Sequence, residues 1–254
     1  MNLVLSLFPG IGLLDMAFEE EGFCVVRGPD LLWGGDVRRF HPPAGKFDGV
    51  IGGPPCQAFS QFRHINPAAG AKHGNMIPEF ERIVGEAQPT WFVMENVSAA
   101  PLPAISGYFT HSEFLNNRWL GEEQHRLRRF TFGCHRHDAR LRIGTEVFEA
   151  PLYSPAVTSA QQAVPVKLGG SGKIKASLRP PTVVGGHGSA FSHERGNMSI
   201  ERMCELQGLP ANYLEEAPFT SHGKRKVIGN GVPLPMGRAV ARAVKEAMAL
   251  KVAA

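Results

Sequence analysis

Cysteine is scarce in this sequence and lacks the spacing of a disulfide or metal scaffold. The four cysteines, Cys24, Cys56, Cys134 and Cys204, are far apart, and no Cys-x-x-Cys pair occurs. This distribution favours a reducing compartment over a disulfide framework. The run from Cys134 to His137 has no second group of ligands at a suitable distance, so we predict no metal site.

Long apolar runs and processing signals are also missing. No stretch approaches the roughly 20 apolar residues that cross a bilayer, and no basic segment precedes a cleavable apolar one at the N-terminus. No internal repeat argues for a solenoid or propeller. With 254 residues and 43% hydrophobic content, we expect one large domain, or one domain with a smaller second, in a soluble cytoplasmic protein.

The balance of charge is only mildly informative. Lysine and arginine number 27 against 23 acidic residues, which gives a formal net charge of +4. A small basic excess suits a polyanionic partner but does not require one. The class of function therefore depends on local motifs.

The N-terminal segment predicts a strand, a glycine turn and a helix. Residues 2–8 form an apolar run typical of a central parallel strand, which Pro9 to Gly12 interrupt. A helical face follows, with Leu13, Leu14, Ala17 and Phe18. This arrangement lets a ligand approach the backbone at a helix N-terminus.

A second strand is predicted over Phe23 to Val26, and two aspartates follow it. Asp30 stands where doubly wound folds commonly hold ribose hydroxyls, although a turn aspartate is the alternative. Asp36 comes so soon afterwards that the helix usual at this point is missing or reduced. Trp33, between them, belongs either to a ligand site or to the core.

A rigid turn presents Cys56 after the next strand. Residues 48–51 read as the end of a buried strand, and Gly52, Gly53, Pro54 and Pro55 then stop it. The prolines restrict the backbone of Cys56, and such a turn at a strand's carboxyl end is where open α/β sheets place their chemistry. A structural loop with a buried thiol is the alternative.

Two further strands carry charged residues. Residues 91–94 are apolar and end in Glu95, after a helical pattern over Glu79 to Ala87 that Pro89 stops. An extended segment over 124–133 would carry Arg126 and Arg128 on one side, followed there by Phe130 and Phe132.

These stretches resemble the motifs of the DNA cytosine-5 methyltransferases. Pro55-Cys56-Gln57 is similar to the family's catalytic Pro-Cys-Gln signature. Similar motifs occur in the family's order at residues 8–12, 35–38, 95–97, 124–128, 206–210 and 229–233. The chain departs from the family at Ser6, where aspartate is usual, and at Gly74 to Ile77, which replace Arg-Gly-x-Leu.

The resemblance implies a covalent mechanism. The Cys56 thiolate would add to C6 of a cytosine flipped out of the duplex, which makes C5 nucleophilic toward a methyl group. Glu95 would hydrogen-bond N3 and the amino group of the base. Arg128 would reach O2, and Arg126 the cysteine loop or a nearby phosphate.

The resemblance also implies S-adenosyl-L-methionine as cofactor. Its contacts would come from Phe8, Gly10, Ile11, Gly12, Asp30, Asp36, Pro54 and Asn230. The turn over residues 8–12 would hold the methionine part of the cofactor. Asp36 would contact the adenine, and Trp33, if it is not a core residue, would cover the adenine face. The last helix, with Val240, Val244 and Met248 on one face, should pack against the first.

Double-stranded DNA is the implied partner. Its contacts would come from Gln57, Ser60, Arg63, Arg179, Lys224 and Arg225. A catalytic domain would span residues 1–133 and 227–254, and a small target-recognition region 134–226, whose shortness predicts recognition of only a few base pairs. Residues 199–210 predict a Ser-capped helix ended by Gly and Pro.

We therefore expect an α/β fold: a Rossmann-like methyltransferase sheet with a small second lobe. The protein would be a monomer of prokaryotic or phage origin that methylates DNA, and any restriction endonuclease would be a separate chain, since no nuclease motif is visible. Methylation of tRNA, a catalytically silent nucleic-acid-binding relic, and transfer of another group by the same covalent chemistry are the alternatives. Residues 57–60 follow the DNA enzymes and favour the first interpretation.

Overall fold

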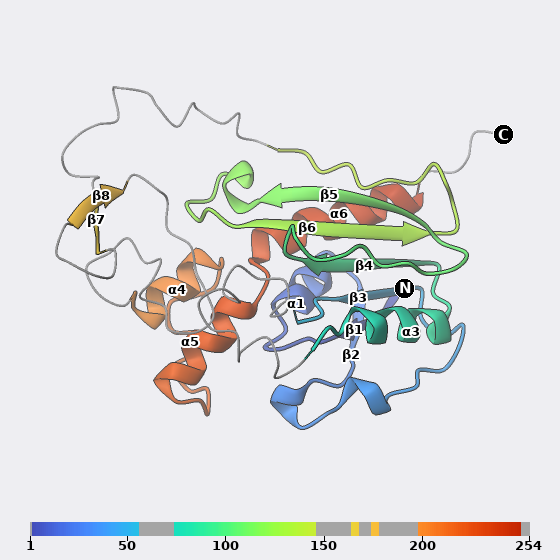
Figure 1. Ribbon diagram of the computed structural model, residues 1–254, viewed down its shortest axis with the longest axis horizontal. Coiled ribbons are helices and arrows are strands. Elements are labelled where there is room, and N and C mark those ends of the chain that lie inside the picture. Colours follow the sequence, from blue (N-terminus) through green and yellow to red (C-terminus); the bar gives the residue numbers. More distant parts are fainter. Residues whose placement is uncertain (1, 56–73, 146–163, 168–173, 178–197, 250–254) are drawn as a thin grey trace. The chain divides into compact units, whose positions relative to one another are not determined.

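The computed structural model describes residues 2–55, 74–145, 164–167, 174–177 and 198–249 (Figure 1). The chain divides into two compact units. The first contains residues 1–115, 127–144 and 237–254, and the second contains 116–126 and 145–236. Residues 116–126 and 227–236 thus group with the second unit, whereas the sequence analysis assigned them to the catalytic domain. A division by compactness leaves the functional boundaries a prediction.

The first unit is built on a six-stranded sheet in the order β2-β1-β3-β4-β6-β5. Its strands are β1 (Leu3–Leu7), β2 (Cys24–Arg27), β3 (Gly49–Gly52), β4 (Trp91–Asn96), β5 (Phe109–Asn116) and β6 (Leu127–Cys134). Strands β2, β1, β3 and β4 are parallel, and β6 runs antiparallel to β4. The turns after the parallel strands consequently gather at one edge of the sheet, as the Rossmann-like prediction requires.

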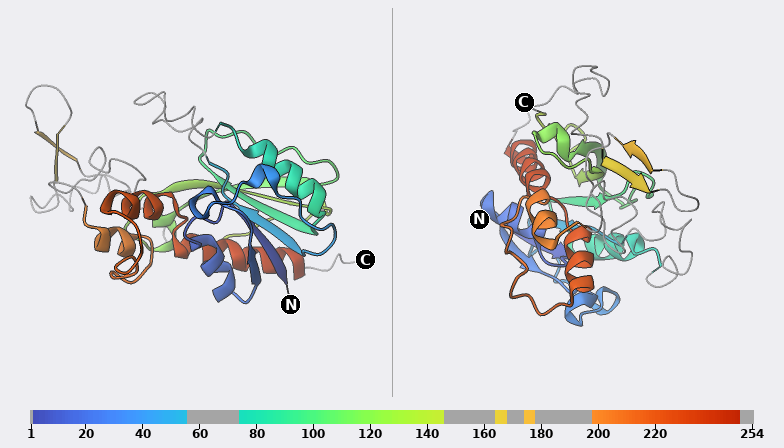
Figure 2. Two further views of the ribbon diagram at one scale, coloured as in Figure 1. Left: turned by 90° about the horizontal axis from the view of Figure 1, so that it is seen from below. Right: turned by 90° about the vertical axis from the view of Figure 1, so that its left-hand side faces the viewer.

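Helices cover both faces of this sheet (Figure 2). On one face, α3 (Ile77–Ala87) buries Phe80, Ile83 and Val84 against apolar residues of β1, β3 and β4. On the other face lie α1 (Leu13–Glu20) and α6 (Leu234–Ala249). The apolar runs of the central strands are thereby buried on both sides, which explains why they do not alternate with polar residues.

The last helix packs against the first, as predicted. A Cβ at Gly237 would lie 2.5 Å from that of Ala17, so the two backbones approach closely. Val240 and Val244 are fully buried. Arg238 and Arg242 pair with Glu20 and Glu21 at 2.5 and 2.7 Å at the exposed margin of this contact.

Short 3₁₀ turns replace a helix between β2 and β3. These are η1 (Leu31–Trp33) and η2 (Val37–Arg39), capped by the side chains of Asp30 and Asp36. This confirms the prediction that the helix usual at this point is missing or reduced. Both turns follow the carboxyl end of β2 and so lie on the side of the sheet where ligands bind in such folds.

The second unit contains α4 (Ile200–Leu206), α5 (Ser221–Asn230), the turn η4 (Asn117–Leu120) and an antiparallel pair of strands, β7 (Val164–Lys167) and β8 (Ile174–Ser177). Ser199 caps α4 by accepting from the Arg202 amide at 3.1 Å, and the chain leaves the helix at Gly208 with a φ of 79°. The predicted Ser-capped helix is therefore confirmed. Throughout the part of the chain that is described, no helix is both long and apolar enough to cross a membrane.

Two glycines let aromatic rings lie flat against the strands. A Cβ at Gly49 would fall 2.2 Å from the ring of Trp91, and one at Gly133 would fall 2.3 Å from the ring of Phe92. Both are closer than real Cβ contacts. Any side chain at these positions would displace a core ring.

We predict that Gly133→Ala lowers the free energy of unfolding by about 1–3 kcal/mol because the added methyl overpacks the core. Gly85→Ala is the matched control, since Gly85 is exposed in α3 with open space around it. That variant should be more stable by about 0.5–1 kcal/mol because alanine favours a helix. Urea denaturation measures both, and equal stabilities for the two variants would contradict the packing argument.

Candidate active site

A strained turn follows β1 at the carboxyl edge of the sheet. Phe8, Gly10 and Gly12 all have positive φ values, of 56°, 56° and 80°. Glycine adopts such values freely, but phenylalanine rarely does, and such residues cluster at functional sites. Gly10 has open space where a Cβ would stand, so the backbone there is accessible to a ligand.

Asp30 and Trp33 are tied to this turn. The Asp30 carboxylate accepts from the Gly10 amide at 2.9 Å and from the Leu32 amide at 2.7 Å. The Trp33 indole donates to the Gly10 carbonyl at 2.7 Å while 60% of the residue stays exposed. Trp33 is therefore not a core residue, and the structure brings it together with Asp30 and the glycine turn.

A buried carboxylate lies beneath the same turn. Asp15 in α1 accepts from the Ser6 hydroxyl at 2.5 Å and pairs with the Nε of Arg27 at 3.0 Å. Arg27 in turn lies against Gly12, where a Cβ would be 2.6 Å from its Nη2. Burial raises the pKa of Asp15, while Ser6 and Arg27 oppose that shift.

Sequence reasoning missed this network. It noted that Ser6 stands where the family usually has aspartate, but not that Asp15 supplies a carboxylate from the neighbouring helix. The available signal was an acid within the apolar face of α1, between Leu14 and Ala17. Such a residue has to find a partner, because a lone charge is costly to bury.

Asp36 lies at the next turn along the same edge. Its carboxylate accepts from the Arg38 amide at 3.1 Å and pairs side-on with the Arg38 guanidinium, at 2.9 Å from Nε and 2.7 Å from Nη2. Arg38 lowers the pKa of Asp36 to about 2. The carboxylate is consequently ionised and can only accept hydrogen bonds near neutral pH.

The start of the cysteine turn is anchored to β4. The Asn96 amide donates to the Pro54 carbonyl at 3.2 Å, and the Glu95 carboxylate lies 3.0 Å from the position of a Cβ on Gly53. Glycine at this position leaves room for Glu95. Cys56, Gln57, Ser60 and Arg63 are outside the described residues.

Glu95 and Arg128 form an ion pair at this point. The Arg128 Nε lies 3.0 Å from the Glu95 Oε1, and the two side chains are only 20% and 12% exposed. Strands β4 and β6 pair antiparallel, and Glu95 is opposite Phe130. Arg128 is two residues before Phe130, so its side chain lies on the same face of β6, diagonally opposite Glu95. The structure thus brings two predicted catalytic residues together beside the Gly53–Pro54 turn, while their roles stay predictions.

Arg126, the other predicted catalytic arginine, lies in the second unit with Asn230. It is buried and donates from Nη2 to the carbonyls of Gly229 and Gly231 at 3.1 and 3.0 Å. These carbonyls lie at the end of α5, where backbone acceptors lack helical partners and the helix dipole is negative. The expected contact of Arg126 with the cysteine loop or phosphate stays a prediction.

Two buried glutamines complete this arrangement. Gln207 donates to the Ile228 carbonyl at 2.6 Å, and Gln124 donates to the Leu206 carbonyl at 2.7 Å. In the sequence analysis both glutamines belong to family motifs, and neither was given a role. Their function within the second unit is to satisfy carbonyls at the ends of α4 and α5.

The predicted phosphate contacts in the second unit are only partly described. Lys224 donates to the Glu215 carbonyl at 2.7 Å, and Arg225 contacts the Met198 carbonyl. Both basic side chains therefore bind backbone carbonyls within the second unit. Arg179 is outside the described residues, so its role also stays a prediction.

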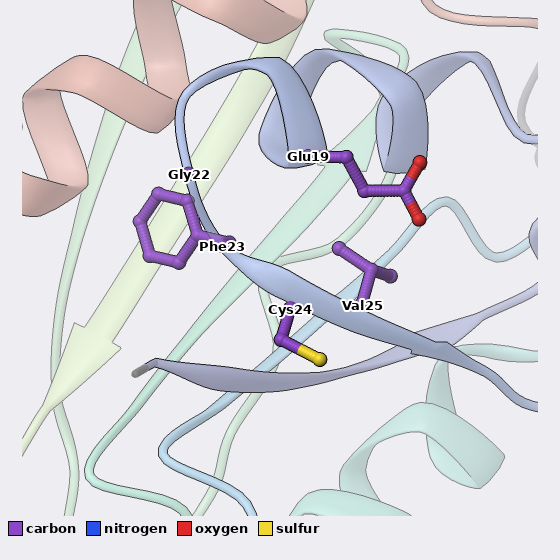
Figure 3. A pocket seen from close by; sticks show the side chains of 5 residues that line it. All are labelled: Glu19, Gly22, Phe23, Cys24 and Val25. Carbon is purple, nitrogen blue, oxygen red and sulfur yellow. The ribbon is translucent and has the colours of Figure 1, made fainter.

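A surface hollow of about 360 Å³ lies elsewhere (Figure 3). Glu19, Gly22, Phe23, Cys24 and Val25 line it, at the amino end of β2. The candidate site instead occupies the carboxyl ends of the strands. Among the described residues, no group of three or more His, Cys, Asp or Glu is arranged to hold a metal ion.

Comparison with known proteins decides the family. Residues 34–101 match the family of C-5 cytosine-specific DNA methylases. The chain is 30% identical over 122 residues to the type II methyltransferase M.HgiGI of Herpetosiphon aurantiacus, covering 40% of this chain and 94% of that protein. The chain belongs to this methylase family.

Other members extend the similarity. The type II methyltransferase M.NgoPII of Neisseria gonorrhoeae is 30% identical over 149 residues, which cover 52% of this chain and 39% of that protein. Across the first curated relatives, the matched region spans about a third to a half of their length, from 32% to 52%.

The fold is shared more widely. The structure of a triple mutant of Spodoptera frugiperda DNMT2 has a TM-score of 0.64 to this structure, over 98% of this chain and 100% of that one, with 12% sequence identity. The predicted methyltransferase sheet is thus confirmed.

We predict a pH-dependent stability effect from Asp15. Its pKa in the folded protein is raised above its ordinary value of 3.8, so in the window between the two values the folded protein binds more protons than the unfolded chain. The free energy of unfolding therefore falls as pH rises through that window. Relative to Asp15→Asn, the wild type should lose stability from pH 3.8 toward neutrality, as measured by urea denaturation at each pH.

Asp138→Asn is the control for this titration. Arg136 holds the pKa of the exposed Asp138 below its ordinary value, so its contribution is lost as pH falls and should be small. A wild-type advantage over Asp15→Asn that does not change with pH would contradict the assignment.

Proposed function

We propose that this chain transfers a methyl group from S-adenosyl-L-methionine to C5 of a cytosine in DNA, through a covalent bond between Cys56 and C6. The observation that carries the proposal is the Glu95–Arg128 ion pair beside the Gly53–Pro54 turn. A carboxylate and a guanidinium that are largely shielded from solvent at the start of a cysteine turn suit a base with a hydrogen-bonding edge. Membership of the methylase family supports cytosine as that base.

The residues after β1 and β2 fit the cofactor. Gly10 has an open Cα face, the Asp30 carboxylate lies at the turn, and the exposed Trp33 indole offers a flat apolar surface. Asp36 adds an ionised acceptor at the next turn. When bound, S-adenosyl-L-methionine supplies an electrophilic methyl group.

The chemistry assigned to the chain's own residues is a sequence of bond changes on cytosine. The Cys56 thiolate forms the Sγ–C6 bond, and the electrons of the C5–C6 double bond move to C5. C5 takes the methyl group as the bond from that group to the cofactor sulfur breaks, which leaves S-adenosylhomocysteine. Water then takes the C5 proton, and the electrons of the C5–H bond restore the double bond as the thiolate leaves. Glu95 holds N3 and the amino group, and Arg128 orients that carboxyl and offsets negative charge on the ring.

DNA is the proposed substrate: residues 34–101 match the family of C-5 cytosine-specific DNA methylases, and two relatives are named type II methyltransferases. Because the base has to leave the stack before C6 can be attacked, the substrate is a flipped nucleotide in a duplex. Methylation of tRNA by the same residues is the second outcome that the assay below distinguishes.

Cys56→Ala should abolish methyl transfer while cofactor binding survives, because the thiolate is the nucleophile and not a cofactor ligand. The measurement is incorporation of labelled methyl into duplex DNA and tRNA, followed by bisulfite sequencing of the DNA. A duplex with 5-fluorocytosine adds a direct readout, since fluorine cannot leave as a cation and the covalent complex accumulates. Label in DNA from the Ala variant, or no adduct with the wild type, would count against the mechanism.

Glu95→Gln should slow transfer by about 10²–10⁴-fold with the fold intact, because the carboxyl acts on the ring nitrogen as the thiolate adds to C6. Single-turnover kinetics on the same duplex measure this effect. Glu20→Gln makes the same chemical change at an exposed carboxylate of α1 and should keep wild-type rates. Near-full activity of Glu95→Gln would remove Glu95 from the mechanism.

A further inference from the structure

Arg82 of α3 reaches across to the turn that follows Asp36. Its Nη2 donates to the Val37 carbonyl at 3.0 Å and to the Phe40 carbonyl at 3.2 Å, and its Nη1 donates to Phe40 at 3.1 Å. One guanidinium therefore binds the carbonyls at both ends of η2. A planar fork of donors can do this, whereas a single ammonium cannot match the same geometry.

Two acids on the same helix hold that guanidinium in place. Glu79 pairs with its Nε at 2.9 Å and Glu86 with its Nη1 at 2.8 Å, one turn away on either side. His41, just beyond the turn, contacts Glu86 at 3.0 Å. The Arg82 side chain is 27% exposed, so this network is better shielded from solvent than an ordinary surface ion pair.

Within the η2 turn, Arg38 binds the Asp36 carboxylate through its amide at 3.1 Å and through its guanidinium. The turn's own bonds run from the Arg39 amide to the Asp36 carbonyl and from the Phe40 amide to the Val37 carbonyl, both at 3.1 Å. Val37 is its buried residue and joins the core beneath α3. Arg38 fixes the Asp36 carboxylate relative to the η2 turn, and Arg82 and Val37 hold that turn to α3. The direction in which Asp36 presents its carboxylate to a ligand therefore depends on both supports.

We infer that Arg82 is a positioning residue for cofactor selectivity: it holds the η2 turn so that Asp36 accepts a hydrogen bond from the 6-amino group of adenine. This rests on the proposed function and on the family resemblance, which implies that Asp36 contacts the adenine of the cofactor. An ionised carboxylate attracts an amino donor and repels a 6-oxo acceptor. If the η2 turn moves, the carboxylate of Asp36 is displaced and no longer discriminates between the amino and the oxo group.

The test is calorimetric binding of S-adenosylhomocysteine and of its 6-oxo counterpart, S-inosylhomocysteine, to the full chain. The wild type should bind the adenine compound at least about tenfold more tightly. The 6-oxo group of the other compound offers no hydrogen to the Asp36 carboxylate and is repelled by it, which costs binding free energy. Arg82→Met should weaken the adenine compound by about tenfold and the 6-oxo compound much less, so the ratio falls toward one.

Two further variants make the result specific. Arg82→Lys keeps a cation for Glu79 and Glu86 but loses the fork, and should give an intermediate ratio in a protein of near-wild-type thermal stability. Arg242→Met removes an arginine that pairs with Glu21 on α6, and should leave the ratio unchanged. In a double-mutant cycle, Arg82→Met should lower the ratio little further once Asp36→Asn is present.

The outcomes separate the inference from the proposed function. A wild type that binds neither compound overturns both. The inference alone is overturned if the wild type discriminates between the two compounds and both Arg82→Met and Arg82→Lys lose stability but keep the full ratio. Arg82 would then be merely structural. A ratio that collapses equally in Arg242→Met would also overturn it.

Discussion

The parallel pairing of β2, β1, β3 and β4 is the constraint on which the site depends. Because these strands run in one direction, the segments that leave them all emerge at the same edge of the sheet. Residues separated by tens of positions in the sequence, such as Gly10, Asp30 and Glu95, are thereby brought to one side of one unit. The pairing is stable because α3 on one face and α1 with α6 on the other bury the strands.

The turns at this edge are held by polar and charged side chains, most of which lie outside the recognised motifs. Asp15 and Arg27 support the glycine turn, and Arg82 supports the turn after Asp36. Asn96 does the same for the cysteine turn through the Pro54 carbonyl. Supports of this kind matter because catalysis and selectivity are sensitive to small displacements of the groups in contact with the ligand.

The second unit uses the polar residues of its motifs differently from the first. Arg126, Gln124 and Gln207 are buried, and they satisfy carbonyls at the ends of α4 and α5. Lys224 and Arg225 also contact backbone carbonyls. Part of the positive charge that sequence analysis assigned to phosphate therefore binds backbone carbonyls of the unit itself. For Arg126 these carbonyls lie at the C-terminus of α5, which offers unpaired acceptors and a negative dipole.

The sequence by itself indicated five of the six strands, with β5 the exception, together with most of the helices and the edge at which the site lies. Apolar runs over β1, β3 and β4 and the spacing of Phe80, Ile83 and Val84 in α3 are local patterns, so they are visible in the chain alone. The motif order indicated the methylase family, which comparison then confirmed.

Tertiary structure decided what those patterns leave open. The exposed Trp33, the pairing of Glu95 with Arg128, and the reach of Arg82 to Val37 all depend on contacts between residues far apart in the chain. Neither periodicity nor spacing encodes such contacts. A buried acid such as Asp15 finds its partners only when strand and helix pack, and that packing also set which charged residues support the site from beneath.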